Sequence, residues 1–225
     1  MNFIKVYASI IYVMRATISI VNGNCLSDID FAAGRIALEN AFKLYLLRNG
    51  IEPIDNVVID NYQSGQPYIN IKEYKSLFCS IGHSYGLGVG AIAPFKIGVD
   101  VEKIRPHTNL LVNYISDQDE QNLVKDFFAH KTDKITLIWT IKESVMKGLG
   151  VGFKIPPKKV KIVSCVGKFF EVEVLDSEVP DWCVFSIGTE AYYISVAYEK
   201  KHGQKKFHNW VNEVSISFAD ISKID

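Results

Sequence analysis

Residues 97–104, IGVDVEKI, carry two carboxylates two positions apart within a run of β-branched residues. Such a run favours a β-strand, in which side chains at positions i and i+2 face the same side, so the carboxylates of Asp100 and Glu102 converge. The apolar neighbours Val99 and Val101 favour a buried strand, and a buried acid requires a cation or several hydrogen-bond donors. Solvated acids on an exposed edge strand are the alternative, and the spacing alone leaves both interpretations open.

A second charged cluster lies in residues 139–150, WTIKESVMKGLG, where Trp139, Glu143 and Lys147 follow one another at four-residue steps. This spacing places the three side chains along one stripe of a helix, with Lys142 beside Glu143. An ordinary salt bridge between residues four apart, with about 0.3–0.5 kcal/mol of stabilisation, would explain Glu143 and Lys147 as well. Together with the first cluster, however, they offer three oxygen ligands and an ammonium, which suits Mg²⁺ held against a phosphate.

The hydrophobic pattern predicts an α+β (α/β) protein. A helix is predicted at 28–48 from the helical spacing of its apolar residues, its Asp-rich start and its Gly stop, and two further helices at 117–130 and 133–149. Strands are predicted within 3–21, twice within 51–70 around a turn at Ser64-Gly65, at 76–84 and 87–95 around a turn at 84–86, and at 96–104, 158–165, 168–175, 182–188 and 192–199. The order predicts two α+β halves that meet near Ala93-Pro94, followed after Glu199 by a peripheral tail with a short helix.

The composition limits the classes of partner and the cellular compartments that fit this chain. Lysine plus arginine and aspartate plus glutamate each number 25, so no global basic field favours nucleic acid. The apolar N-terminal residues 3–21 lack a convincing signal-peptide pattern, and their uninterrupted run is too short to span a membrane. The four cysteines show no metal-ligand spacing, which favours a reduced, cytoplasmic protein with buried thiols. They are Cys25, Cys79, Cys165 and Cys183.

His83 lies in a segment of small residues, SIGHSYG at 80–86. A lone histidine is more often a structural residue than a ligand. Its small neighbours leave backbone N–H groups accessible, however, so an anion pocket around His83 and Ser84 is the alternative.

Residues 97–106 and 139–150 together resemble the signature motifs of the 4′-phosphopantetheinyl transferase superfamily, in its larger, Sfp-type class of holo-carrier-protein synthases. Three upstream segments, FAAGRIALENAF at 31–42, SGQPYI at 64–69 and SIGHS at 80–84, follow in the order found in that family. The resemblance covers roughly residues 31–157. The two carboxylate motifs are specific, and the upstream segments support them.

The resemblance implies a pseudo-twofold monomer that binds CoA and Mg²⁺ between its halves. Such enzymes, which include enzymes of secondary metabolite biosynthesis, transfer 4′-phosphopantetheine from CoA to a serine of an apo acyl, peptidyl or aryl carrier protein and release 3′,5′-ADP. The corresponding division of this chain is an N-terminal half at 1–94 with the nucleotide contacts, a C-terminal half at 95–205 with the metal-binding and catalytic motifs, and a peripheral tail at 206–225.

The resemblance also implies roles for individual residues. Asp100, Glu102 and Glu143 would be the metal ligands, and Glu143 would also be the base for the incoming serine hydroxyl. Lys147 would neutralise the pyrophosphate and the leaving group, with Lys142 assisting. The residues implied to contact CoA are Arg35, Gln66, His83 and Ser84.

Two positions depart from the family pattern. Many relatives have lysine where this chain has Gln66, so one positive charge for the CoA phosphates is missing. Relatives also commonly have serine where this chain has Gly82, which removes a hydroxyl but keeps the backbone N–H. Neither departure touches the metal ligands, so we expect an active enzyme.

Two other functions remain as alternatives. A Mg²⁺-dependent nuclease or phosphodiesterase also uses clustered acids and a lysine. Nucleases of the restriction type have Glu-x-Lys after their aspartate, however, whereas Glu143 is followed by Ser144 and Val145, and the balanced charge offers no DNA-binding face. A non-catalytic CoA- or carrier-binding module would be indicated by degenerate acids, and here all three are present. Lysines of the second half are candidates for meeting an acidic carrier, or are simply solvated: Lys125, Lys131, Lys134, Lys154, Lys158 and Lys159.

Overall fold

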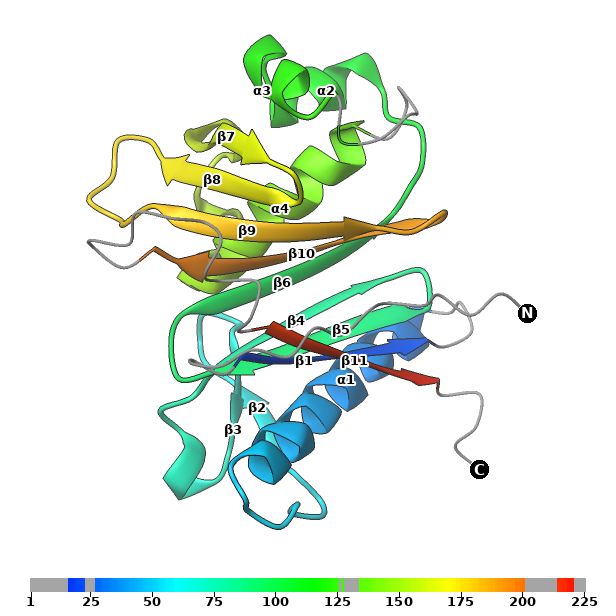
Figure 1. Cartoon of the computed structure of the whole chain (residues 1–225), viewed down its shortest axis with the longest axis vertical. Coiled ribbons are helices and arrows are strands. Elements are labelled where there is room, and N and C mark those ends of the chain that lie inside the picture. The colour runs from blue at the N-terminus through cyan, green and yellow to red at the C-terminus, as the bar shows by residue number, and fades with distance from the viewer. Residues whose placement is uncertain (1–15, 23–26, 126, 128–133, 201–213, 221–225) are drawn as a thin grey trace.

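Two β-sheets stack face to face, with the main helices on their outer sides (Figure 1). This computed structural model describes residues 16–22, 27–125, 127, 134–200 and 214–220. Within these residues, no helix combines the length and apolar character needed to cross a bilayer.

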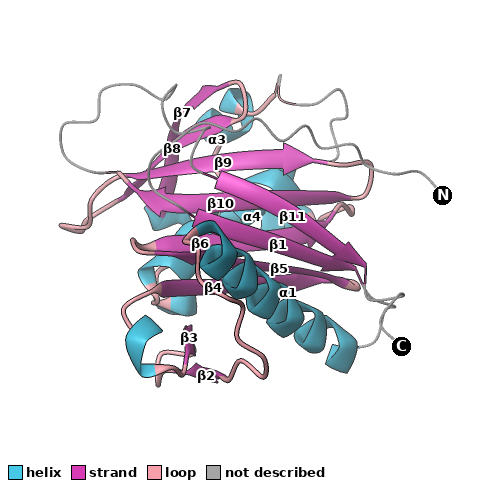
Figure 2. Ribbon diagram, turned by 60° about the horizontal axis from the view of Figure 1, so that its bottom comes forward, coloured by secondary structure: helices cyan, strands magenta, loops and turns pink. Residues whose placement is uncertain are grey.

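The first sheet has the strand order β11-β1-β5-β4. Its strands are β1 (Ala16–Asn22), β4 (Phe78–Ser84), β5 (Leu87–Ala93) and β11 (Val214–Asp220). Helix α1 (Ser27–Arg48) lies across its outer face (Figure 2). Gly88 and Gly90 of β5 permit this close approach, because a Cβ atom at either position would lie 2.2–2.5 Å from the backbone of α1. A small hairpin of β2 (Ile59–Asn61) and β3 (Pro67–Ile69) and a 3₁₀ turn, η1 (Lys72–Tyr74), lie between α1 and β4 in the chain.

The second sheet is antiparallel, with the order β6-β10-β9-β8-β7. Its strands are β6 (Ile97–Lys103), β7 (Val160–Val166), β8 (Phe169–Val174), β9 (Trp182–Gly188) and β10 (Tyr192–Glu199). Its helices are α2 (Asn109–Ile115), α3 (Gln118–Leu123) and α4 (Lys134–Leu149), with 3₁₀ turns η2 (Gly152–Lys154) and η3 (Pro157–Lys159).

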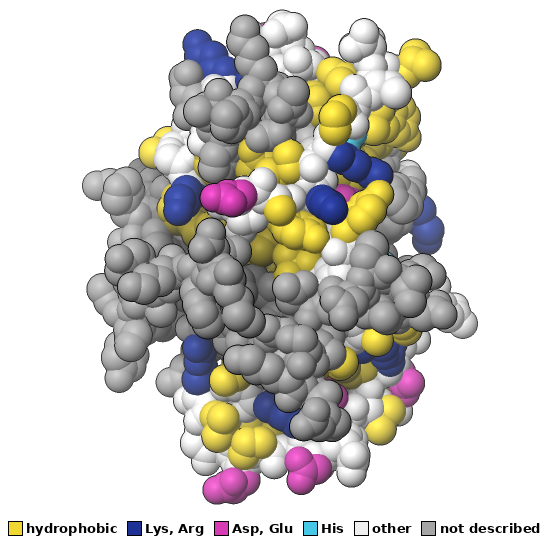
Figure 3. All heavy atoms as spheres, turned by 90° about the vertical axis from the view of Figure 1, so that its right-hand side faces the viewer, with side chains coloured by type: hydrophobic (Ala, Val, Ile, Leu, Met, Phe, Trp, Pro, Cys, Tyr) yellow, Lys and Arg dark blue, Asp and Glu magenta, His cyan; other side chains and the backbone are white. Residues whose placement is uncertain are grey.

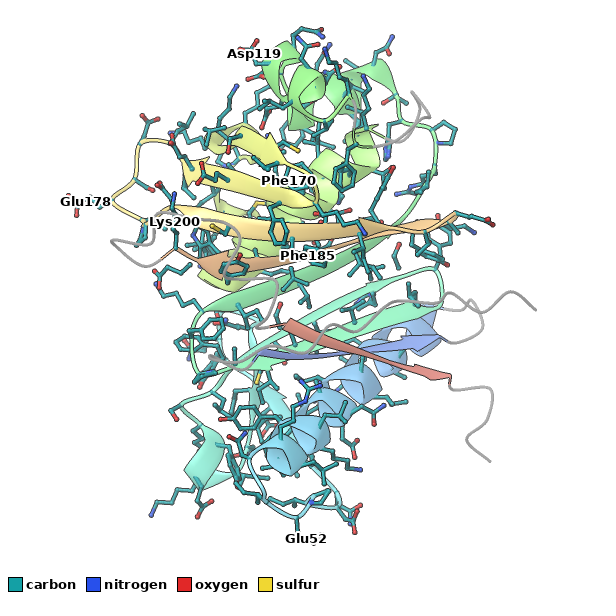
Figure 4. All side chains as sticks on the ribbon, in the orientation of Figure 1. Glu52, Asp119, Phe170, Glu178, Phe185 and Lys200 are labelled. Atoms are coloured by element: carbon teal, nitrogen blue, oxygen red, sulfur yellow. The ribbon has the colours of Figure 1, made fainter. Side chains whose placement is uncertain are left out.

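In the second sheet, successive side chains of a strand point to opposite faces. The apolar ones therefore pack either against α4 or in the core between the two sheets. Phe170 of β8 packs with α4, whereas Phe185 of β9 packs against the core between the two sheets (Figure 4). In β6, Val99 and Val101 enter the core between the sheets. The intervening residues of β6 therefore face α4, as expected for a strand period of two.

The structure confirms the predicted α+β class and the predicted order of strands and helices up to Glu199. It adds α2, a seven-residue helix that was not predicted, whose first turn is capped by the Thr108 hydroxyl. The predicted helix at 117–130 is shorter, because α3 ends at Leu123; the positions 126 and 128–130 lie outside the described residues.

The expected short helix in the C-terminal tail is wrong for residues 214–220, which form strand β11 parallel to β1. The sequence VSISFAD alternates apolar and polar residues through its first five positions, which is the strand period. Of the strands predicted within 3–21, the described part is β1; residues 1–15 lie outside the described structure.

Candidate active site

The close packing of α4 on β6 brings the two acidic motifs together. Gly98 and Gly148 allow this approach, because a Cβ atom on Gly98 would lie 1.9 Å from the carbonyl oxygen of Ser144 and 2.4 Å from the backbone nitrogen of Gly148. Asp100 and Glu102 then face Glu143 from alternate positions of β6. One carboxylate oxygen from each of the three residues lies within 4.8 Å of the others.

Lys147 lies within this group of carboxylates. Its Nζ is 2.7 Å from Oδ1 of Asp100 and 3.6 Å from Oε1 of Glu143, one helical turn earlier. Burial alone would lower the pKa of Lys147, but the charges of Asp100 and Glu143 outweigh this effect and raise it. The ammonium is therefore charged, and it neutralises part of the acidic cluster.

Asp100 retains one unpaired oxygen. The side chain is 2% exposed, and its Oδ2 has no hydrogen-bond partner, although Oδ1 is paired with Lys147. Burial raises the pKa of Asp100 well above its usual range; Lys147 opposes this shift, and Glu143 and Glu102 add to it. A buried carboxylate oxygen without a donor is costly. A divalent cation would satisfy this oxygen and neutralise the surplus negative charge, so the donor set fits a hard metal ion such as Mg²⁺.

The Glu102 carboxylate accepts hydrogen bonds from two neutral donors, one on β4 and one on α4. The Ser84 hydroxyl, at the end of β4, donates to Oε2 at 3.0 Å, and the Trp139 indole, on α4, donates to Oε1 at 3.3 Å. Burial raises the pKa of Glu102, and the bond from Ser84 opposes that rise. Both donors fix the orientation of the carboxylate, which is the usual role of the partners behind a metal ligand.

A cavity of about 350 Å³ opens beside the cluster. Asp100, Glu102, Glu143 and Lys147 lie along part of its wall. The rest of the wall comes from α1, the β2–β3 hairpin, β4 and the end of α4: Phe31, Arg35, Asn61, Ser64, Gly65, Gln66, Pro67, Ser80, Ile81, His83, Gly150 and Gly152. The cavity is therefore built from both sheet layers and has its acidic cluster on the α4 side.

Three of the four residues predicted to contact CoA line this cavity: Arg35, Gln66 and His83. The side chain of Arg35 also donates to the carbonyl of Ile59, which ties α1 to the hairpin. Ser84 does not line the cavity, because its hydroxyl is directed to Glu102. The structure thus places Ser84 behind a predicted metal ligand and away from the predicted nucleotide phosphates.

Of the two departures from the family pattern, Gln66 lines the cavity and Gly82 does not. Gln66 is close to the end of α4, since a Cβ atom on Gly150 would be 2.8 Å from its Oε1. Gly82 packs against β6, where a Cβ atom would lie 3.0 Å from the Cα of Asp100. The glycine therefore brings β4 close to the strand that carries Asp100 and Glu102.

The structure does not bring Lys142 to the site, which corrects the expectation that it assists Lys147. Its Nζ is buried and bonds Glu120 at 2.7 Å, the carbonyl of Ile115 at 2.7 Å and the carbonyl of Pro157 at 3.1 Å. Burial lowers the pKa of Lys142, and Glu120 opposes that shift. With its donors directed to these groups, Lys142 cannot reach a phosphate in the cavity.

Sequence reasoning missed Glu120, whose carboxylate also accepts from the backbone N–H of Ile162. The available signal was a capping box, because Asp117 and Glu120 cap the start of α3 reciprocally. That pattern predicts a helix start, but it does not predict a buried partner for Lys142.

A second cavity, also of about 350 Å³, shares only Glu102 and Glu143 with the first. Its other walls come from the segment after β6, from α2 and from α4: Arg105, His107, Leu111, Ile115, Thr136 and Trp139. Within it, Nε2 of His107 lies 2.8 Å from the Thr136 hydroxyl. Burial and the nearby Arg105 lower the pKa of His107. Glu102 and Glu143 thus form part of the wall of both cavities, and the remaining wall residues of the two cavities differ.

Comparison with known proteins supports the family resemblance. Residues 96–197 match the sequence model described as the 4′-phosphopantetheinyl transferase superfamily. The chain is 26% identical over 128 residues to the 4′-phosphopantetheinyl transferase gsp of Aneurinibacillus migulanus, an alignment that covers 52% of this chain and 48% of the relative. It is 26% identical over 133 residues to the 4′-phosphopantetheinyl transferase of Bacillus subtilis, covering 59% and 58% respectively. A third relative, from Bacillus pumilus, is 24% identical over 101 residues.

The matching region contains both acidic motifs, and the resemblance predicted from the sequence is confirmed. The chain spans about half the length of the curated relatives that it matches.

Proposed function

We propose that this chain, whose residues 96–197 match the sequence model of the 4′-phosphopantetheinyl transferase superfamily, transfers 4′-phosphopantetheine from CoA to a serine of an apo carrier protein. The observation that carries the proposal is the placement of Asp100, Glu102, Glu143 and Lys147 together at the wall of a cavity large enough for part of a nucleotide. The products are the holo carrier protein and 3′,5′-ADP.

In the proposed complex, the first cavity holds the nucleotide part of CoA. Arg35 and His83 lie on its wall and supply positive charge or donors for the phosphates. Gln66 contributes a neutral amide where many relatives have lysine. The proposed contacts with CoA therefore come from α1, the hairpin and β4, while the reacting pyrophosphate lies at the acidic cluster.

Asp100, Glu102 and Glu143 would hold Mg²⁺, which when bound neutralises charge on the pyrophosphate oxygens. The fit rests on the unpaired Oδ2 of Asp100 and on the all-oxygen donor set. Ser84 and Trp139 keep the Glu102 carboxylate oriented for this role.

Transfer needs little covalent help from the protein, because positioning and charge neutralisation dominate phosphoryl transfer. The serine oxygen forms a bond to the phosphorus that carries the pantetheine, and the bond from that phosphorus to the 3′,5′-ADP oxygen breaks. Glu143 accepts the proton of the serine hydroxyl, and the Lys147 ammonium stabilises the negative charge on the departing ADP.

The proposed enzyme works as a monomer in the cytoplasm. The three described cysteines, Cys79, Cys165 and Cys183, form no disulfide, and burial raises the pKa of Cys79 to about 12 and that of Cys183 to about 11. Such protonated, buried thiols agree with a reducing compartment. Cys25 lies outside the described residues.

The test is to incubate the protein with CoA, MgCl₂ and a panel of apo acyl, peptidyl and aryl carrier domains, and to weigh each carrier by mass spectrometry. We expect at least one carrier to gain the mass of one phosphopantetheinyl group, and chelation of the metal to prevent it. Glu143→Gln should fold normally by circular dichroism and lose about 10²–10³-fold in rate, as expected when one charged group is removed from a transition state. If folded protein with metal modifies none of the carriers, the proposal is wrong.

A further inference from the structure

We infer that Ser80 is a positioning residue for the acidic cluster, because its hydroxyl holds the segment of β6 that carries Asp100 and Glu102. Ser80 lies on β4, and its side chain is buried. The inference rests on the proposed function and deepens it, because it adds a residue of the first sheet to the proposed metal site on β6 and α4.

β4 and β6 are edge strands of different sheets, and they run next to each other in the middle of the molecule (Figure 1). Buried backbone N–H groups at the edge of a sheet need acceptors from elsewhere. On β6, serine hydroxyls of β4 supply two of these acceptors. Oγ of Ser80 accepts from the N–H of Val99 at 3.0 Å, and Oγ of Ser84 accepts from the N–H of Lys103 at 3.3 Å. We call this row of contacts, from residues 80–84 to residues 99–103, the β4–β6 seam.

The β4 side of the seam follows the strand period of two residues. Ser80, Gly82 and Ser84 lie at alternate positions of β4 and therefore face the same side. Gly82 permits a close approach, because a Cβ atom there would lie 3.0 Å from the Cα of Asp100 and 3.1 Å from the backbone nitrogen of Val101. A serine side chain is short, so its hydroxyl reaches an N–H group of β6 only when the two strands are this close.

The two bonded N–H groups lie on either side of the two carboxylates along β6. Val99 immediately precedes Asp100, and Lys103 immediately follows Glu102. The segment between them cannot slide along β4, or move away from it, without breaking one of the two hydrogen bonds. The seam therefore fixes the backbone from which both carboxylates project.

Asp100 depends on this backbone support more than Glu102 does. Among the described residues, the Asp100 carboxylate has one hydrogen-bond donor, Lys147, and its Oδ2 has none. The Glu102 carboxylate, in contrast, accepts from two neutral donors. The position of the Asp100 oxygens is therefore decided largely by the adjacent backbone, which Ser80 holds at its N–H.

The peptide unit before Asp100 is also held by α4. A Cβ atom on Gly98 would lie 1.9 Å from a backbone carbonyl oxygen of this helix. The peptide that joins Gly98 to Val99 is thus packed against α4 at one end and bonded to β4 at the other. Because α4 carries Glu143, the hydrogen bond from Val99 to Ser80 helps to set the separation of the Asp100 and Glu143 carboxylates.

The test measures metal binding by the full chain without CoA, using Mn²⁺ as the probe and isothermal titration calorimetry as the method. Ser80→Ala leaves the buried N–H of Val99 without its acceptor, and Ser80→Cys keeps nearly the size of serine but offers only a weak acceptor. Ser186→Ala is the matched control. Ser186 is also buried and its hydroxyl lies 2.8 Å from that of Ser195, but it belongs to β9, with β10 between it and β6.

We expect both Ser80 variants to bind Mn²⁺ about tenfold more weakly than the wild type, at the lower end of the range for residues behind a metal ligand. Ser186→Ala should bind Mn²⁺ like the wild type, although it also removes a buried hydrogen bond. Thermal unfolding of each variant measures the loss of stability, so that a change at the metal site is separated from a general weakening of the fold.

Turnover gives a second readout. With CoA and a carrier that the wild type modifies, Ser80→Ala should lower kcat and leave the KM for the carrier unchanged. Because Ser80 is 2% exposed, its substitution does not alter the side chains on the surface that a partner would meet. Figure 3 shows one face of that surface, where hydrophobic side chains lie next to Lys and Arg side chains in the upper part.

The outcomes separate this inference from the proposed function. A wild type that binds Mn²⁺, together with folded Ser80 variants that bind it equally well, would overturn the role of Ser80 and leave the metal site standing. The inference is also wrong if Ser186→Ala weakens Mn²⁺ binding as much as Ser80→Ala does. If Ser80→Ala does not fold, the comparison of Ser80→Cys with Ser186→Ala decides. A wild type that binds no Mn²⁺ would overturn the proposed metal site and this inference together.

Discussion

Lys142 and Glu120 form an ion pair that is closed to solvent, with the Lys142 Nζ 2.7 Å from Oε1 and 2.9 Å from Oε2 of Glu120. The pair joins α4 to α3, and the carbonyls of Ile115 and Pro157 complete the ammonium's hydrogen bonds. Lys142 precedes Glu143 in the chain, so this pair fixes the helix that presents Glu143 and Lys147 to the acidic cluster.

The first prediction concerns a variant that removes the charge of Lys142 and leaves the charge of Glu120 buried. Lys142→Met should lower the free energy of unfolding by about 3–5 kcal/mol, because the buried Glu120 carboxylate then loses the ammonium that is bonded to it. Urea unfolding followed by circular dichroism measures this change. Lys43→Met is the matched control, since Lys43 pairs with Glu39 on the half-exposed surface of α1 and should cost less than about 1 kcal/mol. Equal stability of the two variants would show that the buried pair is not important for the fold.

The contrast between Lys142 and Lys147 also shows where sequence reasoning succeeds. Periods of two and four residues placed Asp100 beside Glu102 and Glu143 beside Lys147, while the family resemblance implied that the two pairs meet, as they do in the structure. Lys142 was misassigned because it is adjacent to Glu143 in sequence, whereas adjacent residues of a helix point about 100° apart. The side of α4 that Lys142 faces, toward Glu120, is decided by packing between distant segments.

Packing between distant segments also explains why other expectations from the sequence differ from the structure. The resemblance implied that His83 and Ser84 both contact phosphate, but successive residues of β4 point to opposite sides, and the Ser84 hydroxyl reaches Glu102. The strand at 214–220 was missed, although VSISFAD shows the alternation of a strand. Short-range periodicity therefore predicted the two halves of the acidic cluster, while the partners behind it required the tertiary structure.

A second prediction concerns the hydroxyl behind Glu102. Ser84→Ala removes the donor to Oε2 and should weaken binding of Mn²⁺, used as a probe for the metal site, by about 10–100-fold. Isothermal titration calorimetry measures the affinity. Ser177→Ala is the control, because Ser177 bonds only the local backbone of Val174 and Val179 in the structure described and should leave the affinity unchanged. An unaltered affinity in Ser84→Ala would show that Ser84 does not orient the ligand.

A third prediction uses the indole that donates to Glu102. Because Trp139 contacts this carboxylate at 3.3 Å, bound Mn²⁺ should quench part of the tryptophan fluorescence, and Trp139→Phe should abolish that quenching. Fluorescence titration with Mn²⁺ measures the effect, and Glu102→Gln with Trp139 intact tests whether the quenching needs the carboxylate. Full quenching in Trp139→Phe would place the metal elsewhere.

A fourth prediction compares two glycines that bring other elements close to β6. Gly98→Ala places a Cβ atom 1.9 Å from the Ser144 carbonyl, so α4 must move, at a cost of about 1–3 kcal/mol or more and with weaker binding of Mn²⁺. Gly82→Ala meets the Cα of Asp100 at 3.0 Å, which needs a shift of only a few tenths of an ångström, and should have the smaller effect. Thermal unfolding and calorimetry rank the two variants. If Gly82→Ala is the more damaging, the close contact of α4 with β6 is not what positions the cluster.

A fifth prediction tests the missing positive charge at Gln66. Its side chain lines the first cavity close to Gly150, so a charge placed here acts on whatever anion the cavity binds. Gln66→Lys should lower the KM for CoA, and the nearly isosteric Gln66→Glu should raise it, each by about five- to tenfold, or 1–1.4 kcal/mol for one charge near a phosphate. Both variants should leave the KM for the carrier unchanged, because Gln66 lines the first cavity and not the second. Steady-state kinetics with each substrate varied in turn measure these effects. If lysine and glutamate shift the KM for CoA in the same direction, the contact at Gln66 is steric, and the first cavity does not hold the CoA phosphates near this residue.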